Sequence, residues 1–299
     1  MYWNDLNTNL KAQYNTKIYK LALSSGCTCP NRDGTLGTRG CIFCDGAGAF
    51  AETGDIPSQL AAAKRRVAAK TGRDAKYIAY FQSFTNTYAP VERLRRLYSA
   101  AVEPEDVVIL SIATRPDCLS EEILSLLAEI NQVKPVWIEL GLQTIHSASA
   151  RYIRRGYDLP VYESAVQRLK GAGITVVCHQ ILGLPGESPH MMAETAQYIG
   201  QNGADGIKFH LLHVLKGTDL AMDWQAGKFQ TMDLDGYIAA LEDCVRHIPR
   251  EVVIHRLTGD GAKRDLLAPL WSGDKKRVLN AIHNAFRMDD VVQGSALVP

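Results

Sequence analysis

The chain has 299 residues, of which 46% are hydrophobic and 22% are charged, and its formal net charge is +1. This composition is typical of an ordinary globular protein, and the balanced charge gives no overall argument for nucleic-acid binding. No apolar run approaches the ~20 residues that span a bilayer, and the first residues lack the basic and apolar segments of a signal peptide, so we expect a cytoplasmic protein without a membrane partner.

Short apolar runs alternate with helical patterns along the chain. The runs predict strands at residues 17–23, 77–81, 107–113, 136–142, 174–182 and 206–212. The helical patterns lie at residues 58–71, 91–101, 120–130, 160–171 and 188–200, and the last begins with Ser188 as N-cap and Pro189 at the first helical position. Because the apolar runs show no alternation, they predict a parallel sheet that is buried on both faces.

The order of these elements predicts an α/β fold built from repeated βα units. Six units predict a partial (β/α)6 barrel, short of the eight that close a complete barrel. We assign residues 1–218 to this barrel and its N-terminal lead-in. Residues 219–293 form a C-terminal extension, with helices at 234–247 and 276–288 and an apolar run at 252–257, which either caps the barrel or adds a strand beside it. Residues 294–299, GSALVP, resemble a cloning linker.

Three of the seven cysteines follow the first predicted strand within sixteen residues: Cys29, Cys41 and Cys44. An odd number of cysteines in a reducing compartment favours metal binding or catalysis over disulfides. Three thiolates leave a structural zinc site one ligand short, whereas a [4Fe-4S] cluster with three cysteines keeps one iron open to a small molecule. A four-cysteine zinc site that adds Cys27 stays open as an alternative, although Cys27 and Cys29 are closer in sequence than zinc-binding pairs usually are.

The cysteine segment resembles an expanded form of the radical SAM signature, with the aromatic Phe43 before the last cysteine. Seven segments, in order over nearly the whole chain, resemble the bacterial YhcC/YtqA-like radical SAM family, which is similar in turn to the radical SAM domain of the Elongator catalytic subunit. These segments are KLALSSGCTCPNRDGTLGTRGCIFC, YFQSFTNTYAP, SIATRPDCL, ELGLQTIH, ILGLPGES, FHLLHVLKGTDLA and HRLTGDGAKRDLLAPLW. The resemblance implies a partial radical SAM barrel with a C-terminal extension.

The same resemblance implies the cofactors. Cys29, Cys41 and Cys44 are expected to ligate a [4Fe-4S] cluster, and Phe43 to lie beside the adenine of S-adenosyl-L-methionine (SAM). Cys27 is expected to be a small buried residue rather than a ligand. An electron from a reductant such as flavodoxin or ferredoxin would cleave SAM to methionine and a 5′-deoxyadenosyl radical.

Polar residues at the predicted strand ends are candidates for contacts to SAM. By resemblance, Gln82 and Ser83 lie where radical SAM proteins meet the methionyl amino group, and Thr114 begins a segment similar to the TRPD segment of Elongator. The spacing from Gln143 to Arg155 resembles that of oxygen-independent coproporphyrinogen oxidase, in which the glutamine contacts ribose and the arginine the methionyl carboxylate.

Two further candidates lie inside predicted strands, and each has an alternative role. Glu139 is either a SAM contact or a buried carboxylate paired with a lysine. His179 either reaches the ribose or is a histidine whose hydrogen bonds are satisfied within the core. The segment RRGYD stands in place of the commoner NRGHD, which leaves Tyr157 without an assigned role.

Basic residues after the last strands are candidates for substrate binding. His210, His213 and Lys216 come at the end of the sixth strand and after it, and Arg256, Asp260 and Arg264 come at the end of the last apolar run and after it. Such a group would bind an anionic substrate such as a phosphate backbone, or it would form the salt bridges that hold the extension. The resemblance predicts a radical SAM enzyme that acts on tRNA, at a modified wobble uridine. The alternatives are a radical SAM enzyme for a small metabolite or peptide, and a zinc-clipped RNA-binding protein without catalysis.

Overall fold

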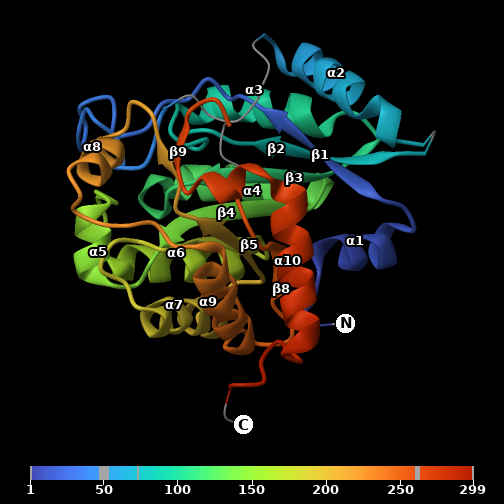
Figure 1. Ribbon diagram of the computed structural model, residues 1–299. Helices are drawn as coiled ribbons and strands as arrows, with labels where there is room; N and C mark the ends of the chain where they lie inside the picture. Colours follow the sequence, from blue (N-terminus) through green and yellow to red (C-terminus); the bar gives the residue numbers. More distant parts are fainter. Residues whose placement is uncertain (1, 47–53, 73, 260–262, 298–299) are drawn as a thin grey trace.

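A curved sheet of seven parallel strands forms the centre of the molecule (Figure 1). The computed structural model describes residues 2–46, 54–72, 74–259 and 263–297. The sheet consists of β1 (Ile18–Leu23), β2 (Lys76–Phe81), β3 (Val107–Thr114), β4 (Val136–Gln143), β5 (Thr175–Leu182), β6 (Gly206–Leu211) and β8 (Val253–Arg256), paired in that order. The first and last strands do not pair with each other, so the sheet is open on one side. The prediction of a partial barrel is confirmed.

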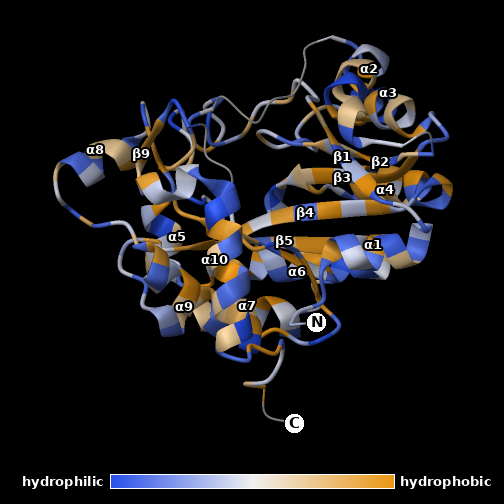
Figure 2. Cartoon of the chain, turned by 45° about the vertical axis from the view of Figure 1, so that its right-hand side comes forward, coloured by the Kyte–Doolittle hydropathy of each residue, from blue (hydrophilic) through white to orange (hydrophobic). Residues whose placement is uncertain are grey.

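The helices that connect the strands cover the outer face of the sheet, with their apolar sides turned toward it (Figure 2). They are α2 (Ile56–Val67), α3 (Val91–Val102), α4 (Glu121–Val133), α6 (Leu159–Gly171), α7 (Pro189–Gln201) and α9 (Leu234–Arg246). Several start at a side-chain cap, because Asp55, Ser120, Ser188 and Asp233 each accept a hydrogen bond from a backbone N–H of the first turn. The predicted cap at Ser188 is confirmed.

A short N-terminal helix, which the sequence patterns did not predict, packs on the half-barrel near the amino ends of its strands. This helix, α1 (Leu6–Tyr14), turns Leu6 and Leu10 toward Ile18, Ile78 and Trp137 of the sheet, where they form a separate apolar cluster. Other elements missed by the prediction are α5 (Ser147–Tyr152), α8 (Asp219–Gln225) and the small antiparallel pair β7 (Val214–Leu215) and β9 (Leu266–Ala268). Helix α1 thus covers the lumen at the amino ends of the strands.

The C-terminal extension adds a strand to the sheet, which was one of the two arrangements expected for it. The apolar run at 252–257 forms β8, which pairs in parallel with β6. The last helix, α10 (Lys275–Met288), packs against α9 (Figure 1). Beyond it, the backbone N–H groups of Gly294 and Ala296 donate to the carbonyls of Val245 and Arg246 at the end of α9.

The strands are largely buried, as expected, but the inner face of the sheet carries polar side chains such as Ser111, Glu139 and Lys208 among the apolar ones. Glu139 on β4 contacts both Lys20 on β1 and Lys208 on β6, although these strands are not neighbours. Only the concave face of a curved sheet permits such contacts, so the three side chains point into the lumen. One or two polar residues per strand scarcely change the mean hydropathy of an apolar run, which is why the pattern did not reveal them.

Candidate functional site

Cys29, Cys41 and Cys44 open onto one cavity of about 190 Å³ at the carboxyl ends of the strands. Most of the side chains expected to contact SAM line the same cavity: Phe43, Thr114, Glu139, Gln143, Arg155 and His179. They come from the cysteine loop, from β3, β4 and β5, and from the segment after α5. Segments far apart in the sequence thus meet where an α/β barrel binds its ligands.

Backbone hydrogen bonds fold the cysteine loop tightly. The carbonyl of Cys29 accepts from the N–H of Arg32 at 2.8 Å, and the carbonyl of Asn31 accepts from that of Gly40 at 2.7 Å. Gly40 has a φ of 73°, and a Cβ at this position would lie 2.8 Å from the Arg32 guanidinium. A glycine is therefore required where the loop turns back toward the second cysteine.

Nitrogen donors and positive charge surround the thiols. Burial and the neighbouring Cys44 raise the pKa of the Cys41 thiol to about 11, an effect that Asn31 and Arg115 oppose. Asn31 Nδ2 lies 3.5 Å from the Cys41 sulfur, and Asp117 holds the Arg115 guanidinium through two hydrogen bonds of 2.9 and 2.7 Å. Burial thus outweighs Asn31 and Arg115, and the free Cys41 thiol stays protonated at neutral pH. The donor and the positive charge beside it suit an iron-sulfur centre, whose sulfurs accept hydrogen bonds.

All three cysteines line the cavity, and Cys44 and Cys29 lie close enough to Cys41 to raise the pKa of its thiol. Within the described part of the chain, no three His, Cys, Asp or Glu side chains lie close enough together to share a single metal ion. Zinc requires its sulfur ligands about 2.3 Å from one centre. Cys27, the fourth ligand of the zinc alternative, is 7% exposed and packs in the main hydrophobic core. Cys27 is therefore not placed as a fourth ligand, whereas Cys29, Cys41 and Cys44 all line the cavity.

An unsatisfied polar atom marks the same cavity. Thr85 lines it, and its buried Oγ1 has no hydrogen-bond partner among the described residues. Buried hydroxyls nearly always have a partner, so this one indicates a place where a bound molecule would supply it. The residues present thus fit both an inorganic centre and a polar organic ligand beside it.

Arg155 and Tyr157 shape the end of β4. The Arg155 guanidinium donates to the carbonyls of Thr144 at 2.7 Å and Tyr157 at 3.0 Å. The Tyr157 ring lies against this guanidinium, 4.6 Å from ring centroid to Cζ, and its hydroxyl donates to the carbonyl of Gly141. Tyr157, which had no role in the sequence, therefore positions Arg155. Gln143 takes a φ of 72°, a strained conformation that is frequent at functional sites.

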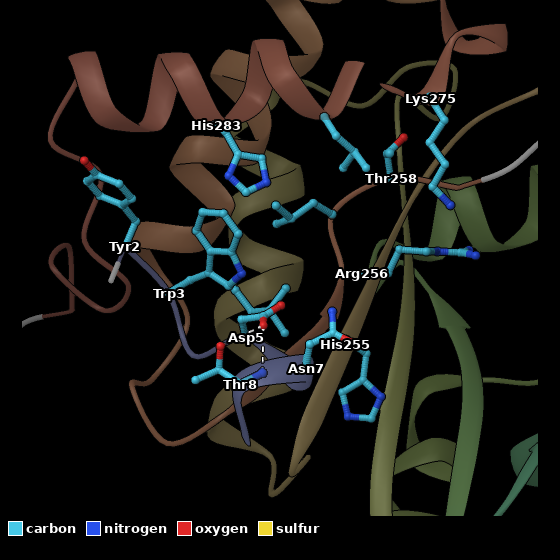
Figure 3. A pocket seen from close by; sticks show the side chains of 13 residues that line it. Tyr2, Trp3, Asp5, Asn7, Thr8, His255, Arg256, Thr258, Lys275 and His283 are labelled. Atoms are coloured by element: carbon cyan, nitrogen blue, oxygen red, sulfur yellow. Dashed lines mark hydrogen bonds between the residues drawn. The ribbon is translucent and has the colours of Figure 1, made fainter. Parts of the chain in front are cut away.

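A larger cavity of about 590 Å³ lies at the β8 edge of the half-barrel (Figure 3). Helices α1 and α10 contribute to its walls, and its lining includes Trp3, Arg256, Lys275 and His283. Trp3 and His283 contact each other edge to face, with ring centroids 5.2 Å apart. The sequence patterns did not predict this cavity, because α1 had no place among the expected elements.

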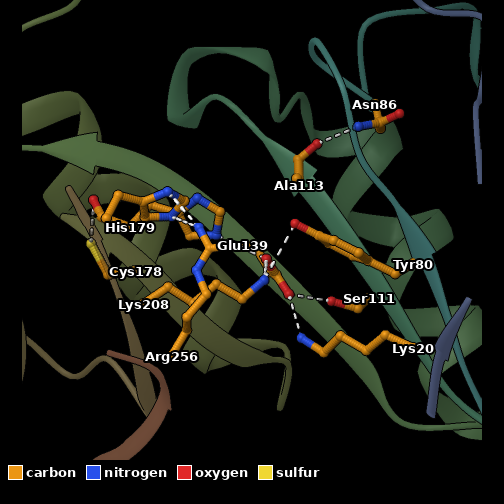
Figure 4. Close-up of polar contacts among 11 residues, drawn as sticks. Lys20, Tyr80, Asn86, Ser111, Ala113, Glu139, Cys178, His179, Lys208 and Arg256 are labelled. Carbon is orange, nitrogen blue, oxygen red and sulfur yellow. Dashed lines mark hydrogen bonds and ion pairs between the residues drawn. The ribbon is translucent and has the colours of Figure 1, made fainter. Parts of the chain in front are cut away.

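Polar side chains from all seven strands of the sheet meet in the lumen (Figure 4). We term them the lumen network, which comprises Lys20, Tyr80, Ser111, Glu139, His179, Lys208, His210 and Arg256. The Glu139 carboxylate is its centre. It pairs with Lys208, accepts a hydrogen bond from Ser111 Oγ at 2.6 Å and lies 2.8 Å from His179 Nε2.

The charge state of the lumen network follows from its burial and its cations. Burial alone would raise the pKa of Glu139, but Lys208 and Lys20 hold it well below its usual value. Burial lowers the pKa of His179 to about 4, although Glu139 opposes this shift. At neutral pH Glu139 is therefore ionised and His179 neutral. The lysine partner considered for a buried Glu139 is present, and both residues also line the cavity of the cysteines.

Two of the residues expected to contact SAM do not line this cavity. Gln82 and Ser83 follow β2, but the lining from this segment comes from Phe84 and Thr85. Ser83 and Phe84 have φ values of 74° and 58°, so the chain turns sharply just after the strand. Because of this turn, the side chains of Phe84 and Thr85 line the cavity in place of those of Gln82 and Ser83.

The three predicted substrate-binding residues do not all lie together. Arg256 belongs to the lumen network. The Lys216 ammonium donates to the carbonyl of Arg264 at 2.9 Å, beside the antiparallel pair of β7 and β9. A Cβ on Gly259 would lie 3.6 Å from His213 Cε1 and 3.7 Å from Arg256 Nη2, so these two side chains are neighbours. Asp260 lies outside the described residues. The structure thus brings two of the three, His213 and Arg256, to the same side of Gly259, next to His210 of the lumen network.

Sequence reasoning missed the lysines of the lumen network. Lys20 and Lys208 each sit in a run that was interpreted only as apolar. A lysine in a buried strand needs a counter-charge, and the single acidic residue in a predicted strand was Glu139. The presence of two lysines and one carboxylate in buried strands was therefore the sequence signal from which the network could have been predicted.

The fold and the site together define a half-barrel with a three-cysteine loop at the carboxyl ends of its strands. The profile of the radical SAM superfamily matches residues 32–199, and that of the radical SAM C-terminal domain matches residues 204–288. The uncharacterised protein YtqA of Bacillus subtilis is 43% identical over 98% of this chain and 92% of its own length. The chain therefore belongs to the radical SAM superfamily, and within it to the YhcC/YtqA-like family. Members of this superfamily are enzymes that bind a [4Fe-4S] cluster and SAM.

Two more distant relatives share part of their chains with this protein. The structure of the archaeal Methanocaldococcus infernus Elp3 superimposes with a TM-score of 0.72 at 19% identity. The match extends over 92% of this chain and 64% of the Elp3 chain, which shows a common fold. The tRNA uridine(34) acetyltransferase of Methanocaldococcus infernus is 28% identical over 51% of this chain and 29% of its own length. Within the described residues, none of the helices combines the length and apolar character needed to cross a membrane.

Proposed function

We propose that Cys29, Cys41 and Cys44 hold a [4Fe-4S] cluster and that SAM occupies the adjoining cavity. The observation that carries this proposal is the shared space, because the three thiols open onto the same 190 Å³ as the polar side chains of the strand ends. When bound, the cluster and SAM would supply a 5′-deoxyadenosyl radical through reductive cleavage of SAM, with an electron from a reductant such as flavodoxin or ferredoxin.

The chain's own residues would bind and orient SAM. Arg155 and Arg115 bring positive charge to the cavity, which suits the methionyl carboxylate. Gln143 offers an amide at the end of β4 for the ribose hydroxyls, and Thr114 offers a hydroxyl at the end of β3. The stack of Tyr157 on Arg155 keeps the guanidinium in place before SAM binds.

An apolar wall beside the cysteines would receive the adenine and exclude water. Phe43 packs against a cluster that includes Ile42, Ile153, Ile181 and Leu184. A flat apolar surface favours a planar ring, and a dry site protects a reactive radical from side reactions. This division into a charged side and an apolar side matches the two halves of SAM.

We infer further that the substrate is tRNA carrying a modified wobble uridine. The support is the similarity of half the chain to a tRNA uridine(34) acetyltransferase, together with the likeness of its segments to the radical SAM domain of Elongator. The excess of basic over acidic side chains in the lumen network supports an anionic substrate, such as a nucleic acid.

Anaerobic reconstitution with iron and sulfide tests the chemistry. We expect a brown protein that converts SAM to 5′-deoxyadenosine when a reductant is added. Purification of a colourless protein loaded with zinc, without SAM cleavage, would instead support a zinc-clipped RNA-binding protein.

Mass spectrometry of tRNA nucleosides from a deletion strain tests the substrate. We expect a modified wobble uridine to be lost, to return on complementation with the wild-type gene, and to remain absent with the Cys41→Ala variant. Unchanged nucleosides in the deletion strain, combined with active SAM cleavage in vitro, would assign the enzyme to a small metabolite or peptide.

A further inference from the structure

Arg256 is a cation without an acidic partner among the described residues. Its Nη2 lies 2.6 Å from His210 Nδ1, and its buried Nε has no hydrogen-bond partner in the described part of the chain. A guanidinium has five N–H donors and stays charged at any pH that a protein meets. Arg256 therefore retains both charge and hydrogen-bonding capacity for a ligand.

The surrounding lumen network does not neutralise this charge. It contains three side chains that carry a formal positive charge, Lys20, Lys208 and Arg256, and one carboxylate, Glu139. Burial and Arg256 lower the pKa of His210 well below its usual value, so His210 is neutral and leaves the balance unchanged. Among the described residues of the network, both lysines pair with Glu139, so no carboxylate of the network compensates Arg256 at the β8 side.

Arg256 also lines the 590 Å³ cavity at the β8 edge. Figure 3 shows Arg256 and Lys275 at one end of this cavity and the rings of Trp3 and His283 at the other. The volume lies within the ~300–1,000 Å³ of typical small-ligand sites. Cations at one end and aromatic rings at the other suit a ligand that carries an oxyanion beside a planar ring.

The lumen network connects this cavity to the cavity of the cysteines. Arg256 contacts His210, and the His210 ring lies against the His179 ring with centroids 4.8 Å apart. His179 in turn lines the cavity of the cysteines. The two cavities therefore share one wall, made of three neighbouring side chains.

We propose that the 590 Å³ cavity binds a nucleotide unit, with its phosphate at Arg256 and Lys275 and its base against Trp3 and His283. The inference rests on the proposed function, since it takes this nucleotide to be part of the nucleic-acid substrate. The cavity then holds a nucleotide next to the reacting one, and the shared wall sets the distance between the two sites.

Isothermal titration of the reconstituted protein, with SAM present, tests the proposal without turnover. The probes are uridine 5′-monophosphate and uridine at constant ionic strength. We expect the nucleotide to bind saturably and the nucleoside at least fivefold more weakly. Arg256→Gln is expected to weaken nucleotide binding at least fivefold and to leave nucleoside binding unchanged.

Two further variants test the phosphate site independently, in case Arg256→Gln does not fold. Lys275 is exposed at the start of α10, so Lys275→Gln should fold normally and weaken nucleotide binding. Arg277→Gln removes the same charge from the same helix turn but lies outside the cavity lining, and it should bind as the wild type does. Equal binding of nucleotide and nucleoside, or unchanged nucleotide affinity in Lys275→Gln, would overturn the proposal.

Competition identifies the source of the nucleotide. Displacement of uridine 5′-monophosphate by an anticodon stem-loop would assign the cavity to RNA, whereas saturable nucleotide binding without such displacement would assign it to a free nucleotide. Displacement by SAM would overturn the proposal, because the cavity would then belong to the cofactor. Nucleotide binding is measured apart from tRNA modification, so unchanged nucleosides in a deletion strain would refute the proposed substrate and leave this result standing.

Discussion

Glu139 on β4 and Lys208 on β6 form an ion pair in the lumen, although β5 lies between their strands. The Glu139 side chain is fully buried, and that of Lys208 is 7% exposed. Losing one partner of a buried pair is costly, because the remaining charge has neither water nor a counter-ion. The native fold is therefore expected to depend on both members of this pair being present on the concave face.

The first prediction concerns this ion pair. Glu139→Gln leaves Lys208 uncompensated and is expected to lower the free energy of unfolding by about 3–5 kcal/mol. Urea denaturation of the purified protein measures the change. The double variant Glu139→Gln with Lys208→Met removes both charges and should recover at least half of the loss. A single variant as stable as the wild type would show that the pair is not a buried charge pair.

The second prediction concerns pH. His179 has a native pKa of about 4 because of burial, whereas in the unfolded chain it titrates near its ordinary value of 6.5. Between these values the unfolded chain binds the extra proton, so the stability present above pH 6.5 is lost as the pH falls toward 4. The loss amounts to about 3 kcal/mol, since one pKa unit corresponds to ~1.4 kcal/mol.

Replacement of the histidine tests this assignment. His179→Asn should flatten the dependence of the unfolding free energy on pH between 6.5 and 4. The matched control is His190→Gln, because the His190 side chain is 80% exposed on α7 and its loss should leave the dependence unchanged. Identical pH profiles for His179→Asn and the wild type would show that His179 is not the group responsible.

The third prediction separates the cysteine ligands from their buried neighbour. Cys41 opens onto the cavity, whereas Cys27 packs in the core. Iron and sulfide content after anaerobic reconstitution should fall to background in Cys41→Ala and stay at the wild-type level in Cys27→Ala. Equal loss from both variants would contradict the ligand assignment, and retention of the cluster in Cys41→Ala would do so as well.

The fourth prediction concerns Arg155. Its guanidinium donates to three backbone carbonyls, of Leu142, Thr144 and Tyr157, and lines the cavity, a geometry that an ammonium group does not reproduce. Arg155→Lys is expected to weaken SAM binding by at least tenfold, measured by equilibrium dialysis of the reconstituted protein. Arg95→Lys changes an exposed arginine that pairs with Glu129 on the protein surface and should bind SAM normally. Normal SAM affinity in Arg155→Lys would remove Arg155 from the site.

The fifth prediction tests the packing of the outer helices. A Cβ on Gly200 in α7 would lie 2.3 Å from Pro249 Cδ, so Gly200→Ala should destabilise the protein by about 1–3 kcal/mol despite the better helix propensity of alanine. Gly171 at the end of α6 has nothing within 4 Å of such a Cβ, and Gly171→Ala should be neutral or slightly stabilising. Thermal unfolding measures both variants. Equal stability of the two variants would show that α7 does not pack against Pro249 as described.

Local patterns were sufficient for most of the fold. The apolar runs, the helical periods and caps such as Ser188 are interactions between residues close in the chain, and each predicted strand and helix is present within a few residues of its expected bounds. Helix α1 was not predicted because its two apolar positions, Leu6 and Leu10, make too short a helical pattern. This helix is stabilised mainly by packing against the sheet.

The sequence by itself was sufficient for the class of the protein, because seven segments in order resemble the YhcC/YtqA-like radical SAM family. The cysteine spacing alone left a zinc site open. Only the tertiary structure decided which polar side chains meet. The turn at Ser83 and Phe84 carries Gln82 past the cavity of the cysteines, and the curvature of the sheet brings Lys20 and Lys208 to Glu139. Contacts across non-neighbouring strands depend on that curvature, which arises from the packing of the whole sheet and leaves no local pattern in the chain.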